Sequence, residues 1–298
     1  MSKFFAMLEE KGLLIADGAT GTMLQKAGLA PGAAPERWNL ERPDAIRALH
    51  RGYIEAGADL ILTNTFGGSA IRLRRDGLED RAAEVNRMAA RIAREMAGET
   101  VGVLGDIGPT GEMMQPLGAL SFEEAVAAFA EQASALAEGG VDAILIETMS
   151  DLEEVRAAVE GVRKATDLPL LVTLSFDTRG RTMMGVKPER AAKALLSLGV
   201  DVMGANCGRT LSETLEAVLK MRAVAPDATL MAKPNAGLPH AEGGDLVYDV
   251  TPEIMAEYAR RFVEEAGVRI FGGCCGSTPD HIRAVVAALR GTSAETSA

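Results

Sequence analysis

Short apolar runs alternate with amphipathic stretches eight times along this chain of 298 residues. Runs this short and this rich in Val, Ile and Leu are typical of strands buried on both faces of a parallel sheet. Strict alternation predicts that a helix connects each strand to the next. Eight repeats favour closure into a (β/α)8 TIM barrel, with an open doubly wound sheet as the alternative. The predicted strands cover residues 13–17, 60–65, 101–106, 143–147, 170–175, 202–206, 229–233 and 268–272.

Helix start and stop signals support the same alternation. The spacing of Ser121 from Glu124, and of Ser150 from Glu153, fits a capping box at two helix starts. Ala-Gly or Gly-Gly pairs then end several helices before the next strand. The predicted helices cover residues 44–55, 80–96, 122–137, 151–162, 188–198, 212–223, 252–265 and 279–289.

The length suits a single domain, because such a barrel takes roughly 250 residues. We predict one barrel over residues 1–290 and a disordered tail over 291–298, where the sequence turns small and polar. Two connections, 25–43 and 237–250, are longer than a barrel requires. Both follow strands, on the face where barrels keep their active sites.

Charge and cysteine content exclude several classes of protein. The net charge of −11 and pI of about 4.9 argue against a nucleic-acid binder and against binding to anionic membranes. Neither a signal peptide nor an apolar run of the ~20 residues of a membrane span is visible. Three cysteines, two of them adjacent, do not make a disulfide framework. We therefore expect a cytoplasmic protein.

Polar residues and glycines gather where nearly every predicted strand ends. In a barrel these ends form one ring around a single pocket, so residues distant in sequence converge there. The strand-end segments are 17–22, 64–69, 105–111, 147–148, 206–208, 233–237 and 272–276.

All three cysteines belong to that ring. Cys207 ends the sixth strand, and Cys274 and Cys275 end the eighth. Three thiolates suit a zinc ion, and three protein ligands leave the fourth position open, as in catalytic sites. The alternative is three buried cysteines acting as small apolar residues. Their shared position at strand ends favours the zinc site.

Three acids also lie at strand ends: Asp17, Asp106 and Glu147. Acids in this ring are candidates for anchoring a substrate amine or for acting as a general base. The alternative, which applies more to Asp106 than to Glu147, is that they accept hydrogen bonds from backbone N–H groups of nearby turns. We interpret His50 and His281, both within helical stretches, as ordinary helix residues.

Together these segments resemble the homocysteine S-methyltransferases. The family includes the homocysteine module of cobalamin-dependent methionine synthase, betaine–homocysteine methyltransferase and enzymes that use S-methylmethionine. The resemblance runs from about residue 13 to 289, and the pairing of GANCG with GGCCG is its most specific part. The matching segments are DGATGT at 17–22, NTFGGS at 64–69, GDIGPTGE at 105–112, IETMSDLEE at 146–154, GANCG at 204–208, KPNAGLP at 233–239 and GGCCGSTPDHI at 272–282.

The resemblance implies a role for each matching residue. Cys207, Cys274 and Cys275 would be the zinc ligands and catalytic residues, with the homocysteine sulfur in the fourth position. Glu147 and the Asp17 turn would hold the amino-acid end of the substrate, and the N–H groups near Ala19 and Thr20 would receive its carboxylate. Asn235 resembles a residue that occupies the metal site when substrate is absent. The family's barrel agrees with the count of eight repeats.

The chemistry of such a site follows from its ligands. A free alkyl thiol is mostly protonated at neutral pH, whereas a zinc-bound one ionises. The zinc-bound thiolate would attack an electrophilic methyl group in line and give methionine.

The methyl donor stays open between betaine, an S-methylsulfonium compound and a methylcorrinoid on a separate protein. Betaine would favour an aromatic cage, for which Phe66, Phe176 and Trp38 are the candidates. Because few aromatic residues lie at the predicted strand ends, the sequence slightly disfavours betaine. The alternative function is a thiol-activating zinc subunit of a corrinoid methyl-transfer system, with a thiol other than homocysteine as acceptor.

Overall fold

The computed structural model describes residues 2–242 and 245–291. In this part of the chain, eight parallel strands follow the sheet order β1-β10-β7-β6-β5-β4-β3-β2. A parallel bridge from Ala16 to Leu60, flanked by two backbone hydrogen bonds, joins β1 to β2 and closes the sheet. The predicted (β/α)8 barrel is therefore confirmed. Its strands are β1 (Leu14–Ile15), β2 (Leu60–Leu62), β3 (Gly102–Ile107), β4 (Ala143–Met149), β5 (Leu170–Leu174), β6 (Val202–Cys207), β7 (Thr229–Pro234) and β10 (Val268–Phe271).

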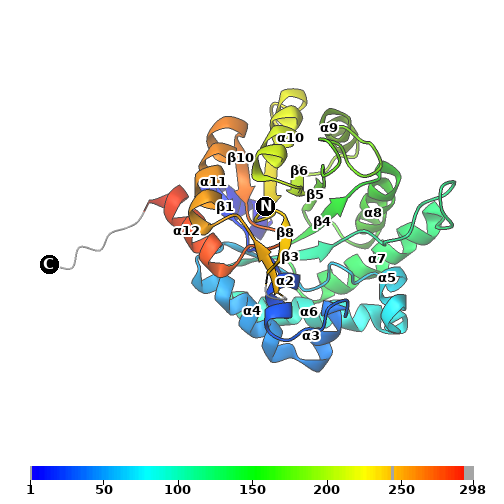
Figure 1. The fold of residues 1–298 in the computed structure, drawn as a ribbon. Helices are drawn as coiled ribbons and strands as arrows, with labels where there is room; N and C mark the ends of the chain where they lie inside the picture. Colours follow the sequence, from blue (N-terminus) through cyan, green and yellow to red (C-terminus); the bar gives the residue numbers. More distant parts are fainter. Residues whose placement is uncertain (1, 243–244, 292–298) are drawn as a thin grey trace.

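Helices surround the strands in Figure 1, which looks along the barrel. Each of the eight predicted helices is present, with ends within a few residues of the prediction. The larger helices are α4 (Pro43–Glu55), α6 (Ala82–Ala97), α7 (Phe122–Glu138), α8 (Leu152–Ala165), α9 (Pro188–Ser197), α10 (Leu211–Val224), α11 (Pro252–Ala266) and α12 (Pro279–Arg290). Short ones are α2 (Gly21–Lys26), η1 (Pro35–Arg37), α3 (Trp38–Glu41), α5 (Ala70–Leu73), η2 (Arg74–Asp76) and η3 (Glu79–Arg81).

One of the two predicted capping boxes is correct. Ser121 and Glu124 exchange hydrogen bonds at the start of α7. At α8 the prediction of Ser150 is wrong, because Asp151 is the cap and its carboxylate accepts the N–H of Glu153. An ionised carboxylate is a strong acceptor for an N-terminal N–H, so the helix begins one residue later.

The barrel interior changes from apolar to polar along the strands. Its lower layers are filled by apolar side chains of all eight strands, including Leu104, Leu145 and Met231. Two residues further along the same strands lie Asp106, Glu147 and Lys233. Because side chains alternate between faces with a period of two, these polar groups stand directly above the apolar layers.

An unpredicted helix, α1 (Lys3–Lys11), closes the lower end of the barrel. Its Phe4, Met7 and Leu8 pack into the same interior cluster as the strand residues. Arg269 of β10 binds the end of α1 by donating to the carbonyls of Leu8 and Gly12 at 2.9 and 3.0 Å. The interior therefore has one open end, at the carboxyl ends of the strands.

Three strands begin with a Gly-x-Asp sequence that locks each one to the strand before it. Asp59, Asp142 and Asp201 accept the N–H groups of Ile15, Val103 and Leu170 at 2.7–2.8 Å. The glycine two residues earlier has a positive φ in each case, which a residue with a side chain rarely adopts. Arg269 of β10 occupies the corresponding place, two residues after Gly267, and binds α1 instead.

The long connection at 237–250, predicted as a loop, contains a two-stranded antiparallel sheet. It consists of β8 (Pro239–Glu242) and β9 (Asp245–Tyr248), and it lies at the carboxyl end of the barrel (Figure 1). The predicted tail falls largely on residues 292–298, outside the described residues. Among the described residues, no helix combines the length and apolarity needed to cross a membrane.

His50 gives the fold a specific sensitivity to acid. It lies buried in α4, as expected of a helix residue, and neither ring nitrogen has a partner in the described structure. Burial lowers its pKa to about 4. The unfolded chain therefore takes up a proton below its ordinary pKa of about 6.5, while the folded chain does not. The contribution of neutral His50 to the free energy of unfolding is therefore fully present above pH 6.5. It is lost as the pH falls from 6.5 towards 4.

We predict that a His50→Leu variant loses this dependence. Between pH 6.5 and 4, wild type should lose up to about 3 kcal/mol more unfolding free energy than the variant. Urea unfolding of both proteins at several pH values measures the difference. If the free energy of unfolding fell equally with pH in the two proteins, His50 would not be buried in its neutral form.

Candidate active site

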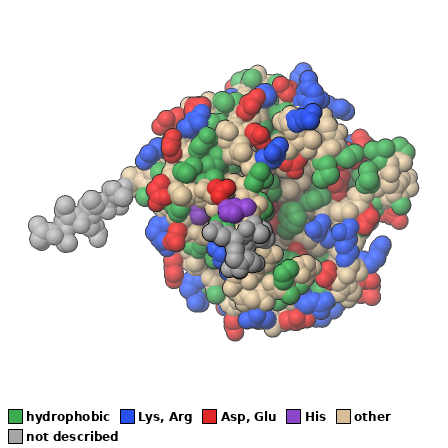
Figure 2. Space-filling model, viewed as in Figure 1, with side chains coloured by type: hydrophobic (Ala, Val, Ile, Leu, Met, Phe, Trp, Pro, Cys, Tyr) green, Lys and Arg blue, Asp and Glu red, His purple; other side chains and the backbone are tan. Residues whose placement is uncertain are grey.

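A cavity of about 680 Å³ opens at the carboxyl ends of the strands. Figure 2 shows it as a hollow on the face of the molecule that is viewed in Figure 1. The carboxyl ends of seven of the eight barrel strands, or the loops that follow them, contribute to its wall, so it is the predicted ring of strand ends. The lining includes Ala19, Thr20, Gln25, Glu36, Asn64, Phe66, Arg72, Asp76, Asp106, Glu147, Thr148, Cys207, Lys233, Cys274 and Cys275.

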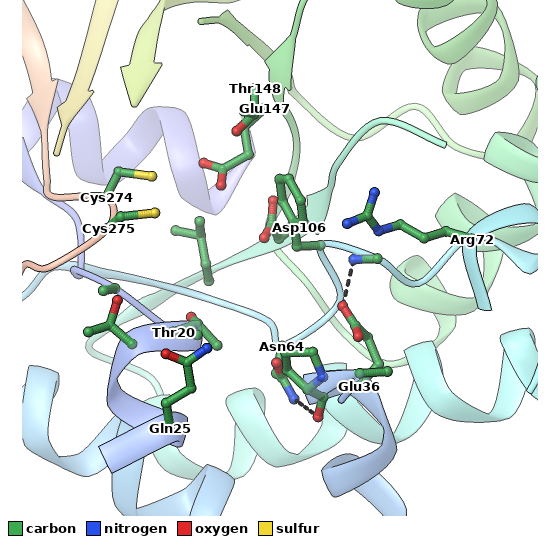
Figure 3. Close-up of a pocket in the computed structure, with 18 of the residues that line it drawn as sticks. Thr20, Gln25, Glu36, Asn64, Arg72, Asp106, Glu147, Thr148, Cys274 and Cys275 are labelled. Carbon is green, nitrogen blue, oxygen red and sulfur yellow. Dashed lines mark hydrogen bonds between the residues drawn. The ribbon is translucent and has the colours of Figure 1, made fainter. Parts of the chain in front are cut away.

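Cys274 and Cys275 lie side by side at one side of this cavity (Figure 3), and Cys207 lies close to both. Their sulfur atoms all lie within 4.8 Å of one another, and the Sγ atoms of Cys207 and Cys274 are 3.0 Å apart. None forms a disulfide, and Cys275 is exposed. Three thiol donors grouped this closely fit a tetrahedral zinc ion with one position left for a further ligand. The alternative of three buried apolar cysteines does not fit, because Cys275 is exposed and the other two are only half-buried.

The backbone bends sharply at Cys207 and at Thr148, whose hydroxyl lies 4.0 Å from the Cys207 sulfur. Cys207 and Thr148 have φ values of 56° and 63°, in a region that residues with side chains seldom occupy. Each such residue costs on the order of 1–3 kcal/mol, and such strain is concentrated at functional sites.

Asn206 links the two strained residues. Its Oδ1 accepts the N–H of Thr148 and the hydroxyl of Thr173, both at 2.8 Å. Its Nδ2 donates to Thr148 Oγ1 at 2.6 Å and to the sulfur of Cys207 at 3.6 Å. The buried amide therefore fixes the ends of β4 and β6 beside the thiols.

The hairpin β8–β9 supports the Cys274–Cys275 loop from outside. The ring of Tyr248 packs on Gly276, where an added Cβ would lie 2.3 Å from the ring. Gly276 also has a φ of 80°, so no other residue fits this turn without strain. The Thr22 hydroxyl accepts the Gly276 N–H at 3.3 Å and ties α2 to the same loop.

Hydrogen bonding among the three thiols shifts their pKa values in different directions. Hydrogen bonds from Cys207 and Cys274 lower the pKa of Cys275 to about 3. Hydrogen bonding with Cys274 and Cys275, followed by burial, raises the pKa of Cys207 well above its usual range. For Cys274, the hydrogen bond with Cys207 lowers the pKa. The hydrogen bond with Cys275 and burial outweigh this effect and raise the pKa of Cys274 to about 12. These hydrogen bonds favour ionisation at Cys275 over the other two cysteines.

A buried cluster of charges forms the floor of the cavity. Lys233 Nζ and Glu147 Oε2 are 3.1 Å apart, with side chains only 2% and 7% exposed. Asp17 and Asp106 are also buried, so three acids surround one lysine. Burial, opposed by Lys233, raises the pKa of Asp17 to about 7, and burial likewise raises the pKa of Glu147. Burial alone would lower the pKa of Lys233, but the surrounding acids raise it.

The Asp17 turn only partly matches the predicted arrangement. Asp17 Oδ2 accepts the N–H of Leu62 at 2.8 Å, so this carboxylate does serve the backbone, and its Oδ1 has no partner among the described residues. Ala19 lines the cavity, but its N–H donates to the Ser277 carbonyl at 3.0 Å and is not available for a substrate carboxylate. The N–H of Thr20 makes no hydrogen bond within the described chain, and the prediction for Thr20 stands.

Asn235 lies beside the cysteines rather than in the cavity wall. Its Nδ2 donates to the Gly208 carbonyl at 2.8 Å, while its buried Oδ1 has no partner in the described residues. Its backbone N–H donates to the carbonyl of Cys207 at 3.2 Å. Its predicted exchange with substrate at the metal site stays a prediction.

The far side of the cavity is formed by residues that the sequence analysis did not single out. Arg72 Cζ lies 5.6 Å from the centroid of the Phe66 ring. Buried Glu36 accepts the Gly67 N–H at 2.6 Å, and burial raises its pKa. Lys233, Asn206 and Tyr248 were missed as well. Lys233 stands in the quoted KPNAGLP segment at a strand end, so the signal that found Glu147 could have found it.

Comparison with known proteins agrees with this geometry. The sequence profile of the family described as homocysteine S-methyltransferase matches residues 14–289. Methionine synthase of Mycobacterium leprae (strain TN) is 36% identical over 296 residues, covering 93% of this chain but 24% of that protein. The same values hold for methionine synthase of Mycobacterium tuberculosis (strain ATCC 25618 / H37Rv). The chain thus spans about a quarter of the length of these relatives.

Solved structures show a similar fold. The metallated form of the homocysteine methyltransferase MmuM from Escherichia coli has a TM-score of 0.79 at 23% identity, covering 95% of this chain and 98% of that one. Its apo form has a TM-score of 0.74 at 24% identity and the same coverage. The profile match over nearly the whole chain, on a barrel with three converging thiols, shows that the chain belongs to the homocysteine S-methyltransferase family.

Proposed function

We propose that this protein transfers a methyl group to the thiol of homocysteine, giving methionine, and that it depends on zinc. The observation that carries the proposal is the convergence of Cys207, Cys274 and Cys275 within 4.8 Å, beside a buried acidic floor, in a member of this family. The thiols would hold the metal, and the floor would hold the amino-acid end of the substrate.

Each residue has a distinct task in this proposal. Cys207, Cys274 and Cys275 supply three sulfur ligands, with Asn206 holding the first of them in place. A bound zinc ion favours the thiolate form of the acceptor and so supplies a nucleophile at neutral pH. Glu147 and Asp17 would bind the substrate ammonium, the Thr20 N–H would receive its carboxylate, and Asn235 would lie against the metal site when substrate is absent.

The cavity gives limited support to betaine as donor. Of the three candidate cage residues only Phe66 lines the cavity, while Trp38 and Phe176 are buried elsewhere. Arg72 already lies over the Phe66 ring. One aromatic face is a poor cage for a quaternary ammonium, so a sulfonium donor or a methylcorrinoid fits better.

A second candidate is a methyl donor carried by a separate corrinoid protein. Exposed apolar side chains at the cavity end of the molecule favour it. Met113, Leu117, Met183, Met184 and Leu238 are exposed, and all lie in loops after barrel strands at the cavity end. The loop carrying Met113 and Leu117 projects from the molecule in Figure 1. Exposed apolar side chains on neighbouring loops are typical of protein contact sites. With such a partner, another thiol could replace homocysteine as acceptor.

Zinc K-edge X-ray absorption tests the acceptor site. The zinc-loaded enzyme should have three sulfur ligands, and addition of homocysteine should raise the count to four. We also propose that the protein is cytoplasmic, where a reducing environment would keep the three cysteines as thiols. A sulfur count that stays at three with saturating homocysteine would contradict the proposed acceptor.

A further inference from the structure

Asp106 is a buried acid whose hydrogen-bonding capacity the protein leaves unused. Glu147 is paired with Lys233 at 3.1 Å, and Asp17 accepts a backbone N–H from Leu62. Asp106 is only 5% exposed, and its Oδ1 has no partner in the described part of the chain. The alternative that Asp106 accepts hydrogen bonds from a backbone turn finds no support, because neither of its carboxylate oxygens has a hydrogen bond in the described residues. A buried acceptor without a donor is unfavourable unless a ligand completes it.

The position of Asp106 identifies what could complete it. It lies near the end of β3, next to β4, which carries Glu147. Figure 3 shows both carboxylates projecting into the cavity between the cysteines and Arg72. A substrate ammonium has three N–H donors, and Glu147 already accepts from Lys233. A second carboxylate would satisfy donors that Glu147 cannot.

We propose that Asp106 is a further carboxylate of the ammonium site, beside Glu147 and Asp17, and that it selects acceptor thiols carrying a free ammonium group. The inference rests on the proposed function, since it takes homocysteine as the acceptor. In this arrangement the ammonium lies between Glu147 and Asp106, and the thiol extends towards Cys274 and Cys275. The ligand class is an α-amino acid with a short thiol side chain.

The charges around Asp106 agree with a cation arriving there. The groups that act on it are Glu147 from β4, Lys233 from β7, Asp17 after β1 and Cys274 after β10. Burial and the charge of Glu147 raise the pKa of Asp106 well above its usual range. An ammonium bound beside Asp106 would act in the opposite direction and favour the carboxylate.

Calorimetric titration of the zinc-loaded enzyme, without any methyl donor, tests the assignment. The two ligands are homocysteine and desamino-homocysteine, which keeps the thiol and carboxylate but lacks the ammonium. Asp106→Asn keeps the shape and removes the charge. It should weaken homocysteine binding roughly 10- to 100-fold and change the desamino ligand less than about twofold. Glu112→Gln is the matched control, because Glu112 is exposed on the same loop and its carboxylate pairs with Arg75 rather than with the charged floor.

Several results would overturn the assignment. Equal weakening of both ligands would mean a merely structural role, and unchanged homocysteine affinity would mean that no ammonium contacts Asp106. Wild type that does not distinguish the two ligands would overturn it as well. Asp106→Ser, checked by circular dichroism, provides a second variant if the first does not fold. Wild type that selects homocysteine but yields no methionine would refute the proposed function and leave the Asp106 assignment standing.

Discussion

Replacing Cys207 by alanine is expected to abolish stable zinc binding and to lower methyl transfer to homocysteine by at least about a hundredfold. Loss of an outer partner of a metal ligand alone costs 10- to 100-fold, and loss of a ligand costs more. Cys207 is also the thiol that Asn206 and the strained end of β6 hold beside Cys274. The remaining pair of adjacent cysteines cannot by themselves provide three sulfur ligands.

Metal content by atomic spectroscopy, with activity on the same samples, measures the effect. Thr210→Ala is the control, since Thr210 caps α10 on the same loop and its hydroxyl accepts the N–H of Glu213. That variant should keep its zinc and lose only some stability, about 1 kcal/mol. A Cys207→Ala enzyme that retains one zinc per chain and full activity would remove Cys207 from the site.

Replacing Lys233 by methionine is expected to lower the free energy of unfolding by about 3–5 kcal/mol. Lys233 is the positive charge buried among Glu147, Asp17 and Asp106. Without it, the acids must protonate or repel one another in a medium of low dielectric constant. Removing Glu147 as well, in Glu147→Gln/Lys233→Met, should restore part of the loss.

Urea unfolding of the four proteins of this cycle gives the coupling energy between Lys233 and Glu147. The matched control is Lys220→Met, which removes a lysine paired with Glu216 on an exposed helix face. It should cost less than about 1 kcal/mol. If Lys233→Met were as mild as that control, or if the double variant were no more stable than the single, the floor would not be a coupled charge cluster.

Local patterns predicted most of the fold and part of the site. The eight apolar runs became eight strands because burial on both faces leaves little choice of residue. Cys207, Cys274, Cys275 and Glu147 could be found because each ends a strand, and barrel closure brings strand ends together. None of these inferences needed the identity of a distant partner.

Features that depend on pairing between distant segments could not be predicted. Helix α1 lacks a preceding strand, and its place is fixed by Arg269, more than 250 residues away. The prediction for Ala19 failed because the Ser277 carbonyl takes its N–H. For Asp106 the sequence left two roles open, a substrate anchor and an acceptor for a backbone turn, and only the structure shows its carboxylate facing the cavity. Strand register rather than local sequence sets which group lies opposite.

Formation of methionine, followed by mass spectrometry, tests the central claim most directly. Reduced, zinc-loaded enzyme would receive homocysteine with S-methylmethionine, S-adenosylmethionine, betaine or methylcobalamin in separate reactions. The account predicts methionine from at least one donor and none when Cys207→Ala replaces the wild type. Absence of methionine with every donor, from an enzyme shown to hold zinc and to bind homocysteine, would contradict methyl transfer by this chain alone.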